Sequence, residues 1–188
     1  MCGRYYFGDL SDYPSLKEIS LALTGHVFSV GEVFPTQNCA VLASGAGAGV
    51  AATVMQWGIR DYKGKLSLIN ARAETVREKP AFRRAFETGR IAVPMSSFFE
   101  WDASKKKLAF YRDPPEALFA LGVSLTYPGS EKSKFAILTT QANESVLSVH
   151  ARMPLLAEKR AVSQWILQRS AAEEMLSLVP KRLERRSA

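Results

Sequence analysis

Short runs of β-branched and aromatic residues recur along the chain, and they constrain its fold more than any other feature of the sequence. Runs of this kind, bounded by glycine, proline and polar residues, are typical of strands. They lie at residues 2–7, 39–43, 52–59, 66–71, 90–94, 108–112, 117–125 and 134–140. Helical patterns do not alternate with these runs, so repeated βαβ units are not expected. The sequence therefore predicts an α+β fold with a mostly antiparallel, curved or barrel-like β-sheet flanked by a few helices.

Two segments carry a helical pattern. Residues 79–89 have Pro80 at a first-turn position, where proline is tolerated, and Gly89 as a stop signal. Residues 158–169 form the second helical pattern. Helical spacing places four of its side chains on one face, namely Val162, Trp165, Ile166 and Arg169.

The length of 188 residues is typical of one domain with a full core. We expect that domain at residues 1–170, followed by a C-terminal helix and basic tail at residues 171–188. The tail ends in "KRLERRSA", which favours a solvated, frayed helix end. The glycine-rich residues 43–52 are predicted to connect two strands of a hairpin. They lack the Lys-Ser/Thr pair and the following helix of a phosphate-binding loop.

The charge balance favours a polyanionic partner. The chain has 25 Lys and Arg residues against 18 Asp and Glu residues, a formal net charge of +7. We find no signal sequence and no run of about 18 apolar residues that could span a membrane. With two cysteines, a secreted disulfide framework is not expected. The sequence therefore predicts a cytoplasmic protein without membrane association.

Cys2 directly follows the initiator methionine. Removal of Met1 is favoured by a small second residue, and it would leave an α-amine and a thiol on Cys2. The amine of such a 1,2-aminothiol condenses with an aldehyde, and the thiol then closes a five-membered thiazolidine ring on the same carbon. The alternative is a small buried hydrophobic residue in a first strand. The first seven residues by themselves favour the buried residue.

Polar side chains at the ends of predicted strands are the next candidates. Alternation along "LINARAET" places Asn70, Arg72 and Glu74 on one side, which suits either a site or the polar face of an edge strand. Glu100 lies between two aromatic residues. It is either an exposed strand residue or a partly desolvated acid whose raised pKa suits proton transfer.

The two histidines are far apart in the sequence. His150 precedes Arg152 in the loop "SVHARMP", while His26 lies in "LTGHVFSV". A lone loop histidine is more often structural or solvated than catalytic, and we expect this of His26. The histidines and cysteines form no close ligand pair, so neither a metal nor another cofactor is expected.

Five separated segments, taken together, resemble one family. They are "MCGRY", "NARAET", "EKPAFRRAF", "FFEW" and "TTQAN…VHARMP", in the family's order, and they extend from Cys2 to about Ile166. The family is that of the SOS-response-associated peptidases, or SRAP proteins. The resemblance implies a sensor that captures abasic sites in single-stranded DNA covalently. It also implies a proposed autoproteolytic removal of the first residue, with AP-lyase-type activity as a further possibility.

The resemblance implies a role for each catalytic candidate. Cys2 would supply the amine and the thiol, and Glu100 would move protons during imine formation and ring closure. His150 would donate a proton to the sugar ring oxygen and promote ring opening. Asn70 would hold the sugar and the terminal cysteine by hydrogen bonds.

DNA-binding residues are implied in the same way. The expected partner is single-stranded DNA containing abasic sites, bound by a monomer. Arg72 and Arg152 match positions that grip phosphates, and Arg4 is a third candidate. Trp57 and Trp101 could stack on bases, although we expect Trp57 in the core. The remaining candidates for DNA contact are Thr139 and Pro35.

The chain also departs from the family pattern. Glu32 stands where members often carry Asn, and Ala151 stands where Asp is common. Glu32 puts a negative charge near the expected DNA groove. The segment after "QWG" lacks the usual proline and aromatic residues. A shortened loop is therefore expected there, with Tyr62, Lys63 and Lys65 as its DNA-contacting side chains.

Two alternative functions remain open from the sequence. N-terminal-nucleophile amidotransferases also begin Met-Cys-Gly and use the freed cysteine, but they need a longer domain and glutamine-binding motifs that this chain lacks. A non-catalytic single-strand binder would keep the basic groove without the chemistry. The presence of Glu100 and His150 argues against that binder.

Overall fold

The computed structural model describes residues 2–60, 66–125 and 133–188. Its strands are β1 (Tyr5–Phe7), β2 (Gly31–Val33), β3 (Asn38–Ser44), β4 (Val50–Trp57), β5 (Ile59–Arg60), β6 (Leu66–Leu68), β7 (Asn70–Arg72), β8 (Arg90–Met95), β9 (Ser97–Trp101), β10 (Lys107–Tyr111), β11 (Leu118–Leu125), β12 (Lys134–Gln141), β13 (Arg152–Pro154), β14 (Leu156–Ala157) and β15 (Glu184–Ser187). Its helices are α1 (Pro14–Ala22), α2 (Pro80–Thr88), α3 (Glu144–Leu147), α4 (Val162–Leu167) and α5 (Arg169–Met175), with 3₁₀ turns η1 (Ala73–Thr75) and η2 (Lys159–Ala161). The α+β class with mostly antiparallel strands is confirmed.

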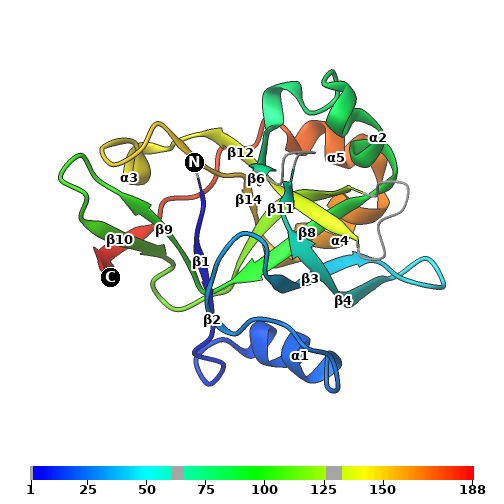
Figure 1. Ribbon diagram of the computed structural model, residues 1–188, viewed down its shortest axis with the longest axis horizontal. Helices are drawn as coiled ribbons and strands as arrows, with labels where there is room; N and C mark the ends of the chain where they lie inside the picture. The colour runs from blue at the N-terminus through cyan, green and yellow to red at the C-terminus, as the bar shows by residue number, and fades with distance from the viewer. Residues whose placement is uncertain (1, 61–65, 126–132) are drawn as a thin grey trace.

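One sheet of the fold closes on itself. Its strands follow the order β13-β12-β4-β3-β8-β11-β14, and β12 also pairs with β11, so that β12, β4, β3, β8 and β11 form a ring. Figure 1 shows helices α2, α4 and α5 beside this ring, with α1 at the opposite end of the molecule. The predicted hairpin at residues 43–52 is confirmed, because β3 and β4 pair in antiparallel register up to Ser44 and Val50. The barrel-like prediction is therefore confirmed.

A second sheet has five strands in the order β15-β10-β9-β1-β2. It carries β1, which follows Cys2, next to β9, which contains Glu100. In register, Tyr5 lies opposite Phe98, and the amide of Phe99 donates to the carbonyl of Arg4 over 2.9 Å. This pairing brings the start of the chain against the end of β9.

Strand β12 has two parts with different partners: its first half closes the ring, and its second half pairs with β7 and β13. Its first half pairs with β4 on one edge and β11 on the other. Its second half pairs with β7 on one edge, where Thr139 lies opposite Arg72, and with β13 on the other, where Gln141 lies opposite Arg152. The strands that carry Asn70, Arg72 and Arg152 are thus fixed by the same strand that closes the ring.

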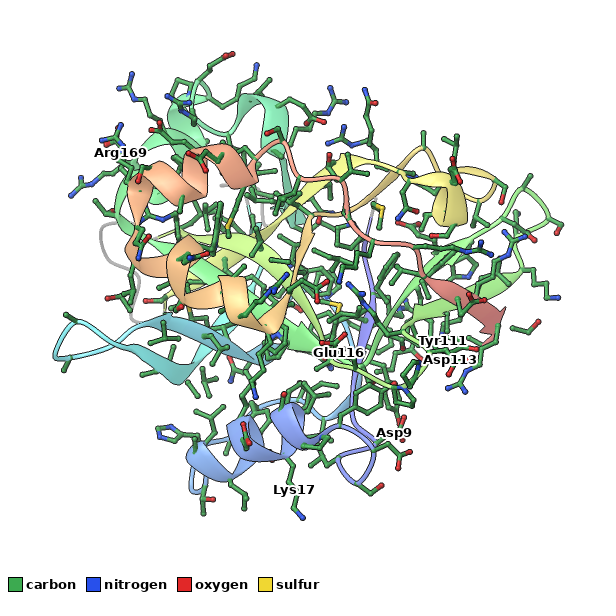
Figure 2. All side chains as sticks on the ribbon, turned by 180° about the vertical axis from the view of Figure 1, so that it is seen from behind. Asp9, Lys17, Tyr111, Asp113, Glu116 and Arg169 are labelled. Atoms are coloured by element: carbon green, nitrogen blue, oxygen red, sulfur yellow. The ribbon has the colours of Figure 1, made fainter. Side chains whose placement is uncertain are left out.

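The helix predicted at residues 79–89 is confirmed as α2, with Pro80 in its first turn and Gly89 as the C-cap. The second helical pattern is interrupted, because Gln168 is extended, with φ −113° and ψ 113°, and α5 begins after it. Val162, Trp165 and Ile166 are buried. Arg169 does not share their face. Its side chain is 61% exposed and points outward in Figure 2, because the extended residue redirects the chain.

The prediction of a frayed helix at the C-terminal tail is wrong. Residues 184–187 form β15, which pairs with β10 in antiparallel register. Leu183, directly before it, is only 3% exposed, and the amide of Ala188 donates to the carbonyl of Lys107 over 3.1 Å. A buried leucine and a free strand edge outweigh the basic composition of this segment.

Arg90 connects the helices to the ring. It is 7% exposed at the start of β8. Its guanidinium donates to carbonyl oxygens near the C-terminal ends of α2 and α4, namely those of Phe86 (2.8 Å), Glu87 (3.0 Å), Trp165 (2.7 Å) and Ile166 (3.1 Å). The last carbonyls of a helix have no partner inside the helix, so one buried cation satisfies two helix ends.

Within the described residues, no helix is long and apolar enough to cross a membrane.

Candidate active site around Cys2

Cys2 lies buried just before β1. Its thiol donates to the carbonyl of Arg4 over 3.7 Å, and Asn70 Nδ2 donates to the Cys2 carbonyl oxygen over 2.8 Å. Burial, and then the charge of Glu100, raise the pKa of the Cys2 thiol to about 12. The thiol is therefore protonated at neutral pH and needs a base before it can act as a nucleophile.

Glu100 is buried on β9, with 4% of its surface exposed. Burial raises the pKa of its carboxyl, and the electrostatic interaction with His150 opposes this rise. Alternation turns Glu100 inward and leaves Trp101 partly exposed. Of the two alternatives from the sequence, the structure thus shows the desolvated acid.

His150 follows α3 and lies within electrostatic reach of Glu100. His150 Nδ1 lies 2.9 Å from both the backbone nitrogen and the carbonyl oxygen of Arg152, so the backbone of Arg152 holds this ring nitrogen in either tautomer. His26 is exposed on a distant loop, as predicted.

Arg152 is held by groups from two neighbouring segments. Its Nη1 and Nη2 lie 2.6 and 2.9 Å from the two carboxylate oxygens of Glu74. Its Nη2 also donates to the carbonyl and hydroxyl oxygens of Thr139. Thr139, a candidate for DNA contact, is 1% exposed, and its hydroxyl group lies toward Arg152. Hydrogen bonds from Arg152 lower the pKa of Glu74, which is therefore ionised beside it.

Arg72 lies one strand position from the buried Ala71 and is exposed. Alternation is confirmed at this strand, since Ala71 and Ala73 are 4% and 2% exposed. The positive charge of Arg72 also contributes to the lowered pKa of Glu74, after the hydrogen bonds of Arg152. Arg72 and Arg152 therefore lie near the same carboxylate.

Arg4 lies between two aromatic side chains on the outer face of the five-stranded sheet. Its guanidinium carbon is 4.0 Å from the ring centre of Phe34 and 5.2 Å from that of Trp101. Phe34 is 38% exposed, and the neighbouring Pro35 is half-buried. This arrangement provides flat apolar surfaces beside a cation. The sequence did not point to Phe34, although its place beside Pro35 could have suggested it.

Trp57 is confirmed as a core residue. It is fully buried, its Nε1 donates to the carbonyl of Ile69 over 2.9 Å, and its ring stacks on Phe135 at 6.3 Å. It therefore cannot stack on a base in this conformation. The loop candidates Tyr62, Lys63 and Lys65 lie outside the described residues.

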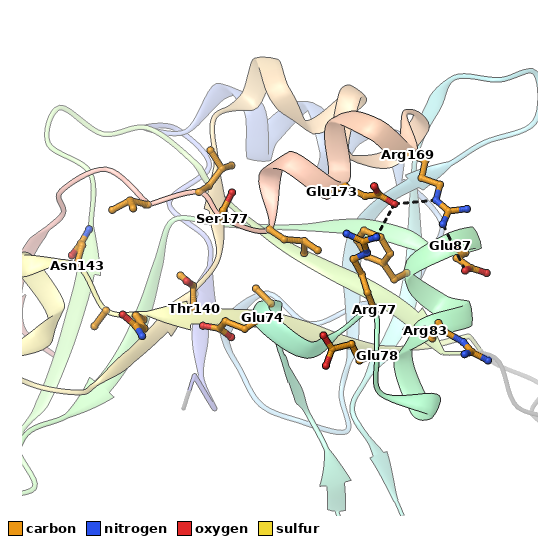
Figure 3. A pocket seen from close by; sticks show the side chains of 17 residues that line it. Glu74, Arg77, Glu78, Arg83, Glu87, Thr140, Asn143, Arg169, Glu173 and Ser177 are labelled. Carbon is orange, nitrogen blue, oxygen red and sulfur yellow. Dashed lines mark hydrogen bonds and ion pairs between the residues drawn. The ribbon is translucent and has the colours of Figure 1, made fainter.

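A cleft of about 880 Å³ borders the site through Glu74 and Thr140. Figure 3 shows arginines and glutamates facing each other across it. Glu173 pairs with Arg77 at 3.5 Å and with Arg169 at 3.2 Å. Because glutamates neutralise the arginines in this cleft, its charges do not favour the binding of an anion. The region around Cys2 therefore remains the candidate for an active site.

The chain is similar to known proteins in sequence and in fold. It is 30% identical over 197 residues to the abasic site processing protein YoaM of Bacillus subtilis (strain 168), over 94% of this chain and 83% of YoaM. It is 29% identical over 180 residues to YoqW of the same strain, also named an abasic site processing protein, over 88% of this chain and 80% of YoqW. A crystal structure of a protein from Bordetella bronchiseptica shares the fold, with a TM-score of 0.81 at 17% identity, covering 100% of this chain and 99% of that chain.

The sequence profile described as "SOS response associated peptidase (SRAP)" matches residues 1–187. This match includes β15 and therefore extends beyond the region of resemblance recognised from the motifs, which ended near Ile166. It also includes the strands that hold Asn70, Glu100 and Arg152. The chain therefore belongs to the SOS response associated peptidase family.

Proposed function

We propose that this protein captures abasic sites in single-stranded DNA through a covalent bond to Cys2, after Met1 has been removed. The observation that carries the proposal is the hydrogen bond from Asn70 to the Cys2 carbonyl, which orients the residue beside a buried Glu100. Similar proteins of this family are named abasic site processing proteins, which supports the choice of substrate.

The first step uses the α-amine of Cys2. An abasic deoxyribose is in equilibrium between a closed hemiacetal and an open aldehyde, and the aldehyde carbon is the electrophile. The amine nitrogen attacks that carbon, and loss of one water molecule gives an imine. An unperturbed α-amine has a pKa of about 7.7 to 8.0, so a useful fraction is neutral near neutral pH.

The second step uses the thiol. The sulfur attacks the imine carbon, the thiol proton moves to the nitrogen, and a thiazolidine ring results without loss of a further atom. The raised thiol pKa opposes this step in the buried pocket. Glu100 can carry the proton from sulfur to nitrogen, and the imine, when protonated, favours the thiolate by its charge.

His150 acts on the sugar before Cys2 does. Its Nδ1 lies against the backbone of Arg152, which holds the ring in place near Glu100. Proton donation to the ring oxygen would open the hemiacetal and expose the aldehyde. In this scheme, Glu100 and His150 handle different protons.

The DNA strand would lie across the charged and aromatic groups around Cys2. Arg72 and Arg152 would contact phosphates beside the lesion, and Trp101 with Phe34 would offer faces for base stacking. Cation and aromatic contacts of this kind show little sequence preference, which suits a sensor of a missing base.

A denaturing gel tests the proposal. Purified protein, whose N-terminus is first established by intact mass, is incubated with single-stranded DNA that contains one abasic site. A denaturation-resistant shift is expected, and its mass should equal protein without Met1 plus DNA minus one water. Cys2→Ala should abolish the shift and keep affinity for undamaged single-stranded DNA within a few-fold.

A mass that retains Met1 in the crosslinked product would contradict the thiazolidine. A heat-stable crosslink in Cys2→Ala would contradict the role of Cys2. Glutaminase activity of the processed protein without any DNA adduct would instead support an amidotransferase.

A further inference from the structure

Glu32 lies on β2, at the outer face of the five-stranded sheet. Its Oε1 is 2.7 Å from Lys107 Nζ and 3.1 Å from Arg4 Nη1, so one carboxylate oxygen binds two cations. These cations come from opposite sides of β9: Lys107 begins β10, and Arg4 precedes β1. Two strands, β1 and β9, lie between β2 and β10, and the side chains of Glu32 and Lys107 meet across them.

Both cations also contact the aromatic surface described above. Lys107 Nζ is 4.0 Å from the ring centre of Phe99, and Arg4 lies between Phe34 and Trp101. The three charged side chains are 22% to 31% exposed, so a strand of nucleic acid can reach them. Within the described part of the chain, the buried Nε of Arg4 has no hydrogen-bond acceptor.

The charge of Glu32 persists at neutral pH. Burial alone would raise the pKa of its carboxyl, but hydrogen bonds from Lys107 and Arg4 outweigh that effect and lower it. A phosphate that approaches Arg4 or Lys107 must therefore compete with a fixed carboxylate. The competition lowers the affinity for any DNA backbone, whether or not it contains a lesion.

We propose that Glu32 is a specificity-determining residue, an internal competitor for DNA phosphates that holds Arg4 and Lys107 so that undamaged single-stranded DNA binds weakly. The proposal rests on the function proposed above. Stacking on Phe34 and Trp101 and covalent capture at Cys2 do not require displacement of Glu32. A lesion that reacts is therefore retained, while an intact strand dissociates.

The test measures noncovalent binding of an undamaged single-stranded oligonucleotide across a series of salt concentrations. Glu32→Gln keeps the size of the side chain and removes the charge. It should tighten binding roughly three- to tenfold. The slope of log K against log salt should steepen by about 0.7 for each cation released. Glu18→Gln is the matched control, since it removes the same charge from α1 at an exposed pair with Lys159.

A double-mutant cycle distinguishes competition between Glu32 and DNA phosphates from a general effect of the protein's net charge. Lys107→Gln alone should leave the salt slope almost unchanged, because Glu32 already neutralises Lys107. In the Glu32→Gln background, the same Lys107→Gln change should flatten the slope by about 0.7.

Two results would overturn the proposal. One is that Glu32→Gln binds undamaged DNA no more tightly than Glu18→Gln, and the other is that Lys107→Gln has equal effects in both backgrounds. Weaker binding by Glu32→Gln would mean that Glu32 positions Arg4 for DNA. Crosslinking of abasic DNA by the unmodified protein is scored separately, so a failure of the proposed function is distinguished from a failure of this inference.

Discussion

Asn70 and Cys2 are 68 residues apart in the sequence, and the side-chain amide of Asn70 donates to the Cys2 carbonyl oxygen over 2.8 Å. This bond ties the start of the chain to β7 and orients Cys2, the residue proposed to carry both nucleophiles. Asn70 Oδ1 is buried and accepts no hydrogen bond from any described residue. It is therefore available to a hydroxyl group of a bound sugar.

Loss of this bond should slow capture. Asn70→Ala is expected to reduce the crosslinking rate roughly 10²-fold, because small displacements of a reacting group have effects of that size. The pH dependence of the remaining rate should keep its shape, because Asn70 does not titrate. Single-turnover crosslinking between pH 5 and 9 measures both quantities, and an unchanged rate would remove Asn70 from the site.

Glu100 should affect the rate and its pH dependence together. Glu100→Gln keeps the shape and removes the base, so crosslinking should slow by roughly 10²-fold or more. In the unmodified protein the rate should rise as the pH passes the raised pKa of Glu100, and this limb should be absent in the variant. A pH profile with the same acid limb in both proteins would contradict the proton-transfer role.

The same substitution should stabilise the fold. A carboxyl with a raised pKa in the folded state contributes stability below its unfolded pKa of about 4.3 and loses it as the pH rises through the folded pKa. Gln does not titrate. Glu100→Gln should therefore melt at a higher temperature than the unmodified protein at pH 7 to 8, and the difference should shrink toward pH 4. Melting curves at several pH values check the direction.

His150 should matter mainly for sugars that must be opened. His150→Ala is expected to slow both capture and its reversal, since reversal passes through the same proton transfers. A reactive aldehyde that cannot cyclise, placed on the same DNA, should rescue His150→Ala far more than Glu100→Gln. Equal rescue of the two variants would show that the proton roles are wrongly assigned.

The two phosphate candidates should differ in their salt dependence. Arg72 is exposed, while Arg152 already binds both carboxylate oxygens of Glu74. Arg72→Gln should therefore flatten the salt slope of DNA binding by about 0.7, and Arg152→Gln by less. Binding titrations at several salt concentrations measure the slopes. A larger effect at Arg152 would mean that DNA displaces Glu74.

Arg90 offers a test of the fold that does not depend on DNA. Arg90→Met leaves carbonyl oxygens at two helix ends without their donor and should reduce the free energy of unfolding by about 2–4 kcal/mol. Arg84→Met, at an exposed position of α2, is the control and should change it little. Urea denaturation of both variants gives the comparison.

The sequence identifies the candidate residues of the site better than it identifies their surroundings. Cys2, Glu100 and His150 stand in short motifs, and the fold class follows from strand patterns that are local. The pairing of Asn70 with Cys2 and the shared carboxylate of Glu32 depend on strand register, which no local pattern fixes. The interruption at Gln168 was missed because helical periodicity continues across it.

Helix α1 and strand β15 were missed for different reasons. Pro14 begins α1 and is a recognisable start signal, so the sequence contained the information. Strand β15 forms because the edge of β10 is available, and its own residues are exposed and, apart from Ser187, charged. Tertiary pairing there outweighs a sequence with little strand character.

The double role of β12 links the assembly of the proposed site to the kinetics of folding. One half of this strand closes the ring, and the other half fixes β7 and β13, which carry Asn70 and Arg152. The pairings of β12 with β4 and β7 join segments far apart in the chain, so they form late and slowly compared with local contacts. During refolding from denaturant, crosslinking activity should therefore return in the same slow phase as burial of Trp57, and no early intermediate should be able to capture DNA.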